Sequence, residues 1–285
     1  MKKILKVIMV IILLGISVLG VACAQGFKDT TLVVMSYNIR TFTLDEKPEN
    51  AWRNRDQLFI QHINDNDPDI IGMQEVSEFQ ADFIIENLAD YDYVLQYRDP
   101  LPGFTEASPI FYKKDKFTLL DSGTFWLSDT PEVMSNTWGG ACYRICTFVV
   151  LKHNASGKVF AHFNTHLDHK SKLARENGLA LIMERMALCC HPSILTGDFN
   201  FNEENELYDF VSTRLDDTKY ISPDTMSSGS FHNFGKIDIT NGSPIDFIMV
   251  SKDDFVPVSY KVLIEDYEGR FTSDHYAVKS VIKIK

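Results

Sequence analysis

Short apolar runs rich in β-branched and aromatic residues recur along most of the chain. Runs of this length and composition, bounded by polar and turn-forming residues, are typical of β-strands. The runs that fit this description cover residues 31–37, 69–73, 93–96, 110–112, 117–120, 146–151, 159–165, 193–196, 246–250 and 276–284.

Three stretches between these runs have the spacing of helices instead. In residues 51–64 and 78–88 the apolar side chains recur on one side, as they do in an amphipathic helix. Residues 172–188 form a longer stretch that is well populated with helix-forming residues. We therefore predict helices in these three places.

The order of these elements predicts the fold class. Strand candidates outnumber helices, and they come as adjacent pairs as well as alternating with helices. This mixture predicts an α/β fold in which two mixed sheets pack together with helices on the outside. A doubly wound parallel sheet is the alternative, and the many consecutive strand candidates count against it. No repeat, low-complexity tract or Pro/Gly-rich linker divides residues 25–285, so we predict one domain there.

The first 24 residues differ from the rest of the chain. A basic start with three lysines precedes an almost unbroken apolar run over residues 7–21, and small residues follow at 22–24. This is the pattern of a secretory signal peptide over residues 1–24. We therefore expect the mature chain to be exported, to the periplasm or outside the cell.

Two alternatives remain for this segment. A membrane anchor is one, but the apolar run is short for a span of about 20 residues and lacks a basic flank on its far side. Lipoprotein anchoring is the other, because Cys23 follows a small residue; against it, Gly20 stands where a lipidation signal usually has leucine. With the segment cleaved, we expect no membrane span.

The composition indicates an acidic globular protein. Hydrophobic residues make up 45% of the chain and aromatic residues 12%, and the net charge is −11. Removal of the three lysines of the first segment would take the charge to about −14. Such acidity disfavours a broad grip on nucleic acid, which relies on many Lys and Arg contacts to phosphates. A bound metal can nevertheless supply the charge of a local phosphate site. We expect a monomer.

Four cysteines follow the first segment, namely Cys142, Cys146, Cys189 and Cys190. Neither close pair suits an internal disulfide, because positions i and i+4 on a strand lie about 13 Å apart. A disulfide between the two pairs stays open, and the sequence contains no CxxC metal motif.

Polar residues stand at the ends of five of the predicted strands. They are Asn38, Glu75, His166, Asp198 with Asn200, and Asp274 with His275. A single residue of this kind is usually part of a turn, but five strand ends rich in oxygen and imidazole ligands are harder to attribute to turns. Carboxylate and amide oxygens suit hard divalent cations, and histidine suits proton transfer near neutral pH.

These strand ends carry motifs with a family resemblance. SYNIR, GMQE, NTHLDH, LTGDFN, PIDFIMVS and TSDHYAV follow one another over residues 31–283. In this order they resemble the motifs of the endonuclease/exonuclease/phosphatase superfamily, the deoxyribonuclease-I-like group, and the chain looks like a bacterial secreted member. The resemblance implies a four-layer α/β/β/α sandwich, with the active site at one edge of the two packed sheets.

The resemblance also implies a metal site and a set of catalytic residues. Glu75 resembles the principal metal ligand, and Asn38 and Asp274 would complete or support the site. Mg²⁺ is the expected cofactor, with Mn²⁺ as the alternative.

Among the catalytic residues that the resemblance implies, Asp198 and Asn200 would orient the attacking water and stabilise the charge that develops on phosphorus. His275 resembles the histidine that a partner carboxylate polarises, and that carboxylate would be Asp246. His166 would bond a phosphate oxygen or protonate the leaving group.

Four further residues are weaker candidates. Arg144 would reach a phosphate through its planar fork, or form a salt bridge at the sheet edge. Trp138 and Phe231 would stack on a base or a sugar ring of the substrate. For Trp138, packing in the core is the alternative. Glu106 would be the carboxylate that pairs with the first catalytic histidine of deoxyribonucleases, or a surface acid.

The function predicted from the sequence is that of a divalent-metal-dependent phosphoesterase. It would hydrolyse a phosphodiester or phosphomonoester bond by in-line attack of an activated water. A catalytically silent module that binds a phosphorylated ligand on the same fold is the alternative, although none of the expected catalytic groups is missing from the sequence. Within the hydrolase prediction, the sequence leaves nucleases, lipid phosphodiesterases and sugar- or inositol-phosphate phosphatases open as classes.

Overall fold

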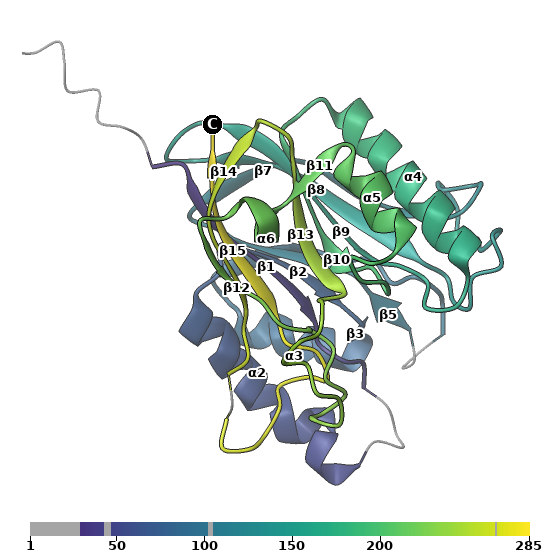
Figure 1. The fold of residues 1–285 in the computed structure, drawn as a ribbon, viewed down its shortest axis with the longest axis vertical. Coiled ribbons are helices and arrows are strands. Elements are labelled where there is room, and N and C mark those ends of the chain that lie inside the picture. The colour runs from purple at the N-terminus through teal and green to yellow at the C-terminus, as the bar shows by residue number, and fades with distance from the viewer. Residues whose placement is uncertain (1–28, 43–46, 102–104, 266) are drawn as a thin grey trace, which may run out of the picture.

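The computed structural model of the protein describes residues 29–42, 47–101, 105–265 and 267–285. The predicted signal peptide, residues 1–24, lies outside these described residues. Two large mixed sheets lie together in the middle of the molecule, with helices on both outer sides (Figure 1). This architecture confirms the predicted fold class of two packed mixed sheets flanked by helices.

The first sheet has seven strands in the order β12-β14-β15-β1-β2-β6-β4. Its parallel pairs are β1 with β2 and β12 with β14, and its other neighbours are antiparallel. The strands are β1 (Thr31–Asn38), β2 (Ile70–Gln74), β4 (Tyr91–Val94), β6 (Ile110–Lys113), β12 (Asp224–Met226), β14 (Phe255–Val262) and β15 (Val278–Ile284).

The second sheet has six strands in the order β11-β13-β10-β9-β8-β7. Only β9 and β10 run parallel among its described neighbours. The strands are β7 (Phe117–Trp126), β8 (Ile145–His153), β9 (Val159–His166), β10 (Ser193–Asp198), β11 (Leu215–Asp217) and β13 (Asp246–Ser251), and a separate small ladder joins β3 (Val76–Ser77) to β5 (Glu106–Ala107).

Helices cover the outer face of each sheet. Those on the first sheet are α2 (Trp52–Asn66), which a 3₁₀ turn η1 (Pro48–Asn50) precedes, and α3 (Glu78–Asn87). Those on the second sheet are α4 (Lys172–Cys189) and α5 (Glu206–Ser212), and α6 (Thr218–Ile221) is a single short turn. The three predicted helices correspond to α2, α3 and α4.

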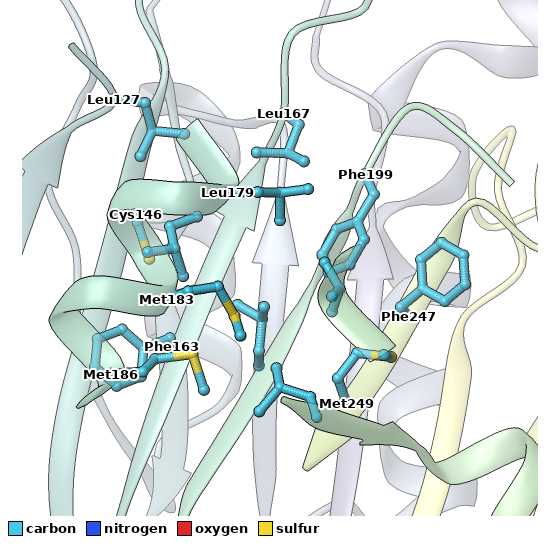
Figure 2. Close-up of a cluster of buried hydrophobic side chains, with 14 of the residues drawn as sticks. Leu127, Cys146, Phe163, Leu167, Leu179, Met183, Met186, Phe199, Phe247 and Met249 are labelled. Carbon is cyan, nitrogen blue, oxygen red and sulfur yellow. The ribbon is translucent and has the colours of Figure 1, made fainter. Parts of the chain in front are cut away.

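Alternation of side chains along the strands builds three apolar cores. On β1, Leu32 and Val34 belong to the core between the two sheets, whereas Met35 and Tyr37 belong to the core under α2 and α3. The third core lies between the second sheet and α4 (Figure 2). Three layers of apolar side chains between four layers of structure are what an α/β/β/α sandwich requires.

A group of buried polar side chains lies between the sheets, close to one edge; we call Gln74, His162, Asn164 and Thr196 the polar layer. Asn164 Oδ1 accepts hydrogen bonds from Gln74 Nε2 at 2.8 Å and from Thr196 Oγ1 at 2.9 Å. His162 Nε2 lies 2.7 Å from Thr196 Oγ1. The sheets approach closely here, because a Cβ at Gly72 would lie 2.2 Å from Thr196 Oγ1. The polar layer therefore fixes how one sheet sits on the other.

The strand predictions were incomplete: the short strands β3, β5, β11 and β12 were not predicted, and two longer strands also differ from the prediction. The run predicted at 117–120 is the start of β7, which continues to Trp126 past a register shift between Leu119 and Asp121. β14 was not predicted, because Pro257 interrupts its apolar pattern. Proline is tolerated there because the ladder shifts register between Pro257 and Ser259.

Two further expectations concern the cysteines and the membrane. Cys142, Cys146, Cys189 and Cys190 are all free thiols, so the disulfide that the sequence left open is not formed. None of the helices in the described part of the chain is long and apolar enough to cross a membrane.

Candidate active site

A cavity of about 500 Å³ lies at the edge of the sandwich where β1, β2, β9 and β10 end. Its lining includes Glu75 and Asp274, next to strands of the first sheet, and His166 and Asp198, from strands of the second. Because β1 runs parallel to β2 and β9 runs parallel to β10, the residues that follow these strands reach the same edge. The predicted strand-end residues thus converge on one pocket, although they span the sequence from residue 38 to residue 275.

Asn38 connects the two sheets at the base of this pocket. Its Nδ2 donates to Glu75 Oε1 at 3.1 Å and to Asp198 Oδ2 at 3.0 Å. Its Oδ1 accepts from the backbone N–H of Arg40 at 3.0 Å. Every polar atom of this buried amide is therefore used, and the Glu75 and Asp198 carboxylates are held on either side of it.

The Glu75 carboxylate is ionised in spite of its burial. Burial opposes ionisation, but the positive charge of Arg40, the Thr41 backbone N–H and the Asn38 amide together keep the pKa of Glu75 below its ordinary value. Asp274 differs, because burial, with the charge of Glu75 nearby, raises its pKa. Two carboxylates that share a small space favour a cation between them.

Asp198 has the properties of a base poised near neutrality. Burial and the neighbouring Asp246 carboxylate raise the pKa of Asp198 to about 7. Its Oδ1 accepts the backbone N–H of Asn200 at 2.9 Å, so the side chain is fixed in place. A carboxylate with a pKa near the working pH exchanges a proton readily.

Asn200 fixes the ring of His166 beside Asp198. Asn200 Nδ2 lies 2.9 Å from His166 Nε2 and also donates to the Leu167 carbonyl at 2.9 Å. Burial, with the positive charges of Arg144 and Arg98, holds the pKa of His166 well below its ordinary value. The lowered pKa favours the neutral ring, which Asn200 holds in place beside Asp198.

His275 and Asp246 form a buried ion pair on the other flank of Asp198. His275 Nδ1 lies 2.8 Å from Asp246 Oδ2, and Ser230 Oγ donates to the same oxygen at 2.6 Å. Burial alone would lower the pKa of His275, but the charge and hydrogen bond of Asp246, followed by Asp198 and Asp274, raise it to about 10. The imidazolium thus presents Nε2–H toward Asp198 Oδ2, 3.7 Å away.

Two groups of side chains in the pocket are candidates to hold a metal ion. Asp198, Asp246 and His275 offer ligand atoms within 4.8 Å of one another, but the hydrogen bond between His275 Nδ1 and Asp246 Oδ2 already engages two of these residues with each other. Glu75 and Asp274 offer hard oxygen donors instead. Arg40 lies between them, with Nη1 3.7 Å from Glu75 Oε2 and Nε 3.8 Å from Asp274 Oδ2. The chemistry of this second donor set fits a divalent cation such as Mg²⁺ or Mn²⁺.

A second cationic group, Arg98 with Arg144, also borders His166. Arg98 Nη1 pairs with Glu106 Oε2 at 2.7 Å, and Arg144 Nη2 lies 3.2 Å from His169 Nδ1. Burial, together with the negative charge of Glu75, raises the pKa of Glu106 to about 7. Glu106 is therefore neither a surface acid nor the partner of His166, because β3–β5 pairing turns it toward Arg98.

Backbone strain gathers around the pocket. Arg40, Glu75, Asn200 and Asn233 all line it, and all have left-handed backbone conformations, with φ of 58°, 62°, 53° and 48°. This region is costly for residues other than glycine, and strained backbone concentrates at functional sites. For Glu75, the conformation turns the carboxylate away from the strand direction of β2 and into the pocket.

The two aromatic candidates lie in different places. Phe231 lines the pocket, and its ring centroid is 4.9 Å from that of His275. The structure does not bring Trp138 to the pocket: its Nε1 donates to Asp129 Oδ1 at 2.8 Å, and its ring packs beside α4. Trp138 therefore packs against the apolar core, as the alternative prediction had it, because the loop after β7 folds onto α4.

Three residues at the pocket were not singled out from the sequence. Arg40 follows Asn38 by two positions, and a cation directly after the SYN motif was a usable signal. Arg98 and Ser230 gave no such signal, because their neighbours Glu106 and Asp246 are close only after the strands pair.

Comparison with known proteins gives consistent matches. The sequence pattern described as the endonuclease/exonuclease/phosphatase family matches residues 35–275. The uncharacterized protein L388 of Acanthamoeba polyphaga mimivirus is 30% identical over 250 residues, which cover 80% of this chain and 90% of that protein.

Solved structures extend the likeness to nearly the whole chain. An endonuclease/exonuclease/phosphatase family protein from Bacteroides thetaiotaomicron has 36% sequence identity and a TM-score of 0.86, covering 91% of this chain and 100% of that one. The mannosyl-6-phosphatase of Bacteroides thetaiotaomicron VPI-5482 also has 36% identity, with a TM-score of 0.83, over 88% of this chain and 99% of that chain.

Proposed function

Because this chain belongs to the endonuclease/exonuclease/phosphatase family, we propose that it is a divalent-metal-dependent phosphoesterase. It hydrolyses a phosphoric ester by in-line attack of water, in a pocket built from both sheets. One observation carries the proposal: a continuous chain of contacts runs from the Glu75 carboxylate through Asn38 to Asp198, and from Asp198 to His275 and Asp246. Hard oxygen donors and acid–base groups are thus next to one another.

Asp198 is the base in this proposal. Its pKa of about 7 lets it accept the proton of the attacking water near neutral pH. Hydrogen bonds from Asn200 N and Asn38 Nδ2 fix the carboxylate, so that the water is oriented as well as deprotonated.

Charge on the phosphoryl oxygens is met by cationic and dipolar groups fixed before the reaction begins. His275 holds a proton on Nε2, because Asp246 occupies Nδ1. The Asn200 amide and the neutral ring of His166 adjoin it, and His166 stands where it bonds a phosphate oxygen or the leaving group. Glu75 and Asp274, with Asn38 in support, would hold Mg²⁺ or Mn²⁺, which would supply the remaining charge neutralisation.

A sugar phosphate is the first substrate to test. The mannosyl-6-phosphatase that matches at 36% identity supports this choice. The acidity of the chain, with its net charge of −11, speaks against long nucleic acid as the main substrate. We also propose that residues 1–24 direct export, so that the enzyme acts outside the cytoplasm. We propose further that it acts as a monomer.

The test is a screen of the purified protein, with Mg²⁺ or Mn²⁺ added, over sugar, nucleotide and lipid phosphates. We expect turnover that EDTA abolishes and that Asp198→Asn or His275→Gln lowers by about 10³-fold or more. The matched controls Asp253→Asn and His191→Gln alter exposed residues and should change nothing. A folded, metal-loaded protein that hydrolyses none of these esters would identify a silent binding module instead.

A further inference from the structure

Two buried guanidinium groups line one end of the pocket. Those of Arg98 and Arg144 border it together with His166, and their side chains are only 12% and 6% exposed. Two cations buried side by side lose hydration and repel each other. Such an arrangement is stable only if anions compensate the charge.

The carboxylates of the protein compensate this charge only in part. Glu106 Oε2 pairs with Arg98 at 2.7 Å. Asp99 Oδ2 lies 3.6 Å from Arg98 Nε and Asp168 Oδ2 lies 3.8 Å from Arg144 Nε, and both distances are beyond hydrogen-bonding distance. The Asp168 carboxylate accepts backbone N–H groups of four other residues instead. Within the described chain, Nε and Nη1 of Arg144 and Nε of Arg98 donate no hydrogen bond. Unused donors on buried cations indicate that an anionic ligand completes the site.

The position of these donors suits the reacting phosphate. His166 adjoins both arginines and also lies 3.5 Å, through Nε2, from Asp198 Oδ2. The small space beside the guanidinium groups, which Ala107, Ser108 and Ile145 also border, has no room for a water molecule. A ligand in the main pocket therefore cannot extend into this space.

We propose that Arg144 and Arg98 hold the terminal oxygens of a phosphomonoester dianion, which makes small phosphomonoesters, and not phosphodiesters, the substrate class of this site. The inference rests on the proposed function and narrows it. A monoester has three non-bridging oxygens and nearly two negative charges at pH 7. A diester has two such oxygens, one charge, and a second ester group that needs space beyond phosphorus. The planar fork of arginine matches a pair of phosphate oxygens.

Binding without metal tests this directly. Calorimetric titration in EDTA at pH 8 compares inorganic phosphate with dimethyl phosphate, which represents a diester. We expect phosphate to bind at least tenfold more tightly, and Arg144→Gln to weaken phosphate binding by about 10- to 100-fold. The matched control Arg53→Gln removes an exposed arginine of α2 and should bind as the unaltered protein does. Equal affinity for the two ligands, or phosphate binding that Arg144→Gln leaves unchanged, overturns the proposal.

Turnover provides a second test with a matched pair of substrates. With Mg²⁺ present, we expect Arg144→Gln to lower kcat/KM for para-nitrophenyl phosphate by about 100-fold and for bis(para-nitrophenyl) phosphate by less than about threefold. Arg144→Lys keeps the charge but lacks the planar fork, so its kcat/KM for para-nitrophenyl phosphate should lie between those of the unaltered protein and Arg144→Gln. Preference for the diester, or equal losses on both esters, overturns the inference but leaves the phosphoesterase intact. If the protein hydrolyses neither ester but still binds phosphate selectively, the result supports the anion site formed by Arg144 and Arg98 and overturns the proposed function.

Stability separates this role from a structural one. Because Nε and Nη1 of Arg144 are unsatisfied, Arg144→Gln should melt no lower than the unaltered protein when phosphate is absent. Phosphate should raise the melting temperature of the unaltered protein and of Arg53→Gln but not of Arg144→Gln. A fall of more than about 5 °C in the phosphate-free variant would show that Arg144 serves folding, and would overturn the proposal.

Discussion

The polar layer and the pocket lie next to each other on the same strands, yet their hydrogen bonding differs. Asn164 and His166 are two positions apart on β9, and Thr196 and Asp198 are two positions apart on β10. All four are buried. In the polar layer the side chains bond mainly to one another and to the backbone, so the group is nearly complete without a ligand.

The unpaired atoms in the two regions differ in charge. Within the described residues, the polar layer leaves Gln74 Oε1 and His162 Nδ1 unpaired, and both are neutral acceptors. The pocket leaves His166 Nδ1 unpaired as well, but it also leaves charged groups with unpaired atoms: Asp246 Oδ1, and N–H groups of Arg98 and Arg144, which are cationic donors. An unpaired neutral acceptor is a modest cost, whereas an unpaired buried cation is a large one. The burial of polar side chains therefore does not mark a site by itself, but buried charged donors without acceptors do.

The largest loss of activity that would distinguish the pocket from the polar layer is expected for Asp246→Asn. The change removes the negative partner of His275, so the imidazolium is no longer held at Nδ1, and kcat should fall by about 10³-fold. Folding should be nearly unchanged, because the amide keeps the size of the carboxylate. Steady-state turnover with saturating Mg²⁺ and far-UV circular dichroism measure the two quantities. A loss of activity below tenfold would show that the pair is structural, like the polar layer.

The next largest effect is expected for Asn164→Leu, which should lower stability and leave activity nearly unchanged, the reverse of Asp246→Asn. This change leaves Gln74 Nε2 and Thr196 Oγ1 without their shared acceptor, so the free energy of unfolding should fall by about 3 kcal/mol. The kcat of the folded protein should stay within about threefold, since the hydrogen bonds of the Asn164 side chain go to Gln74, Thr196 and the backbone of Met73 and Pro109. Urea unfolding measures the loss, with the exposed Asn87→Leu as control. A kcat loss as large as that of Asp246→Asn would break the comparison.

The smallest effect concerns the pH dependence of stability. Burial lowers the pKa of His162 in the polar layer to about 3, whereas an unfolded histidine titrates near its ordinary value of 6.5. Below pH 6.5 the unfolded chain therefore binds a proton that the folded chain does not, and stability falls as the pH falls, by up to about 1.4 kcal/mol per pH unit. His162→Gln should reduce this slope between pH 6 and pH 4, and the exposed His191→Gln should not. Identical slopes in all three proteins, from urea unfolding at each pH, would show that His162 is not held neutral by the layer.

The sequence could predict the residues of the pocket that directly follow apolar strands. Asn38, Glu75 and Asp198 each end such a run, and parallel neighbouring strands bring their ends to one edge. The fold class followed from the same runs. What the sequence alone could not predict depends on contacts between distant segments: Glu106 meets Arg98 only after β5 pairs with β3, and Trp138 is held elsewhere by Asp129.

Local conformation was also beyond sequence reasoning. Glutamate and arginine have no preference for left-handed backbone, so nothing in the sequence indicated that Glu75 and Arg40 adopt it. Similarly, the alternation of β14 is hidden by Pro257, and only its pairing with β15 shows that it is a strand.

The hydrogen bond from Asn38 to Asp198 joins one sheet to the other and is only 3.0 Å long. Any shift of one sheet over its neighbour by an ångström would break it. Substitutions that repack the apolar interior, even tens of residues away along the chain, would thus lower the catalytic rate before they unfold the protein. The evolutionary freedom of this interior is therefore narrower than that of an enzyme whose reacting groups all stand on a single sheet.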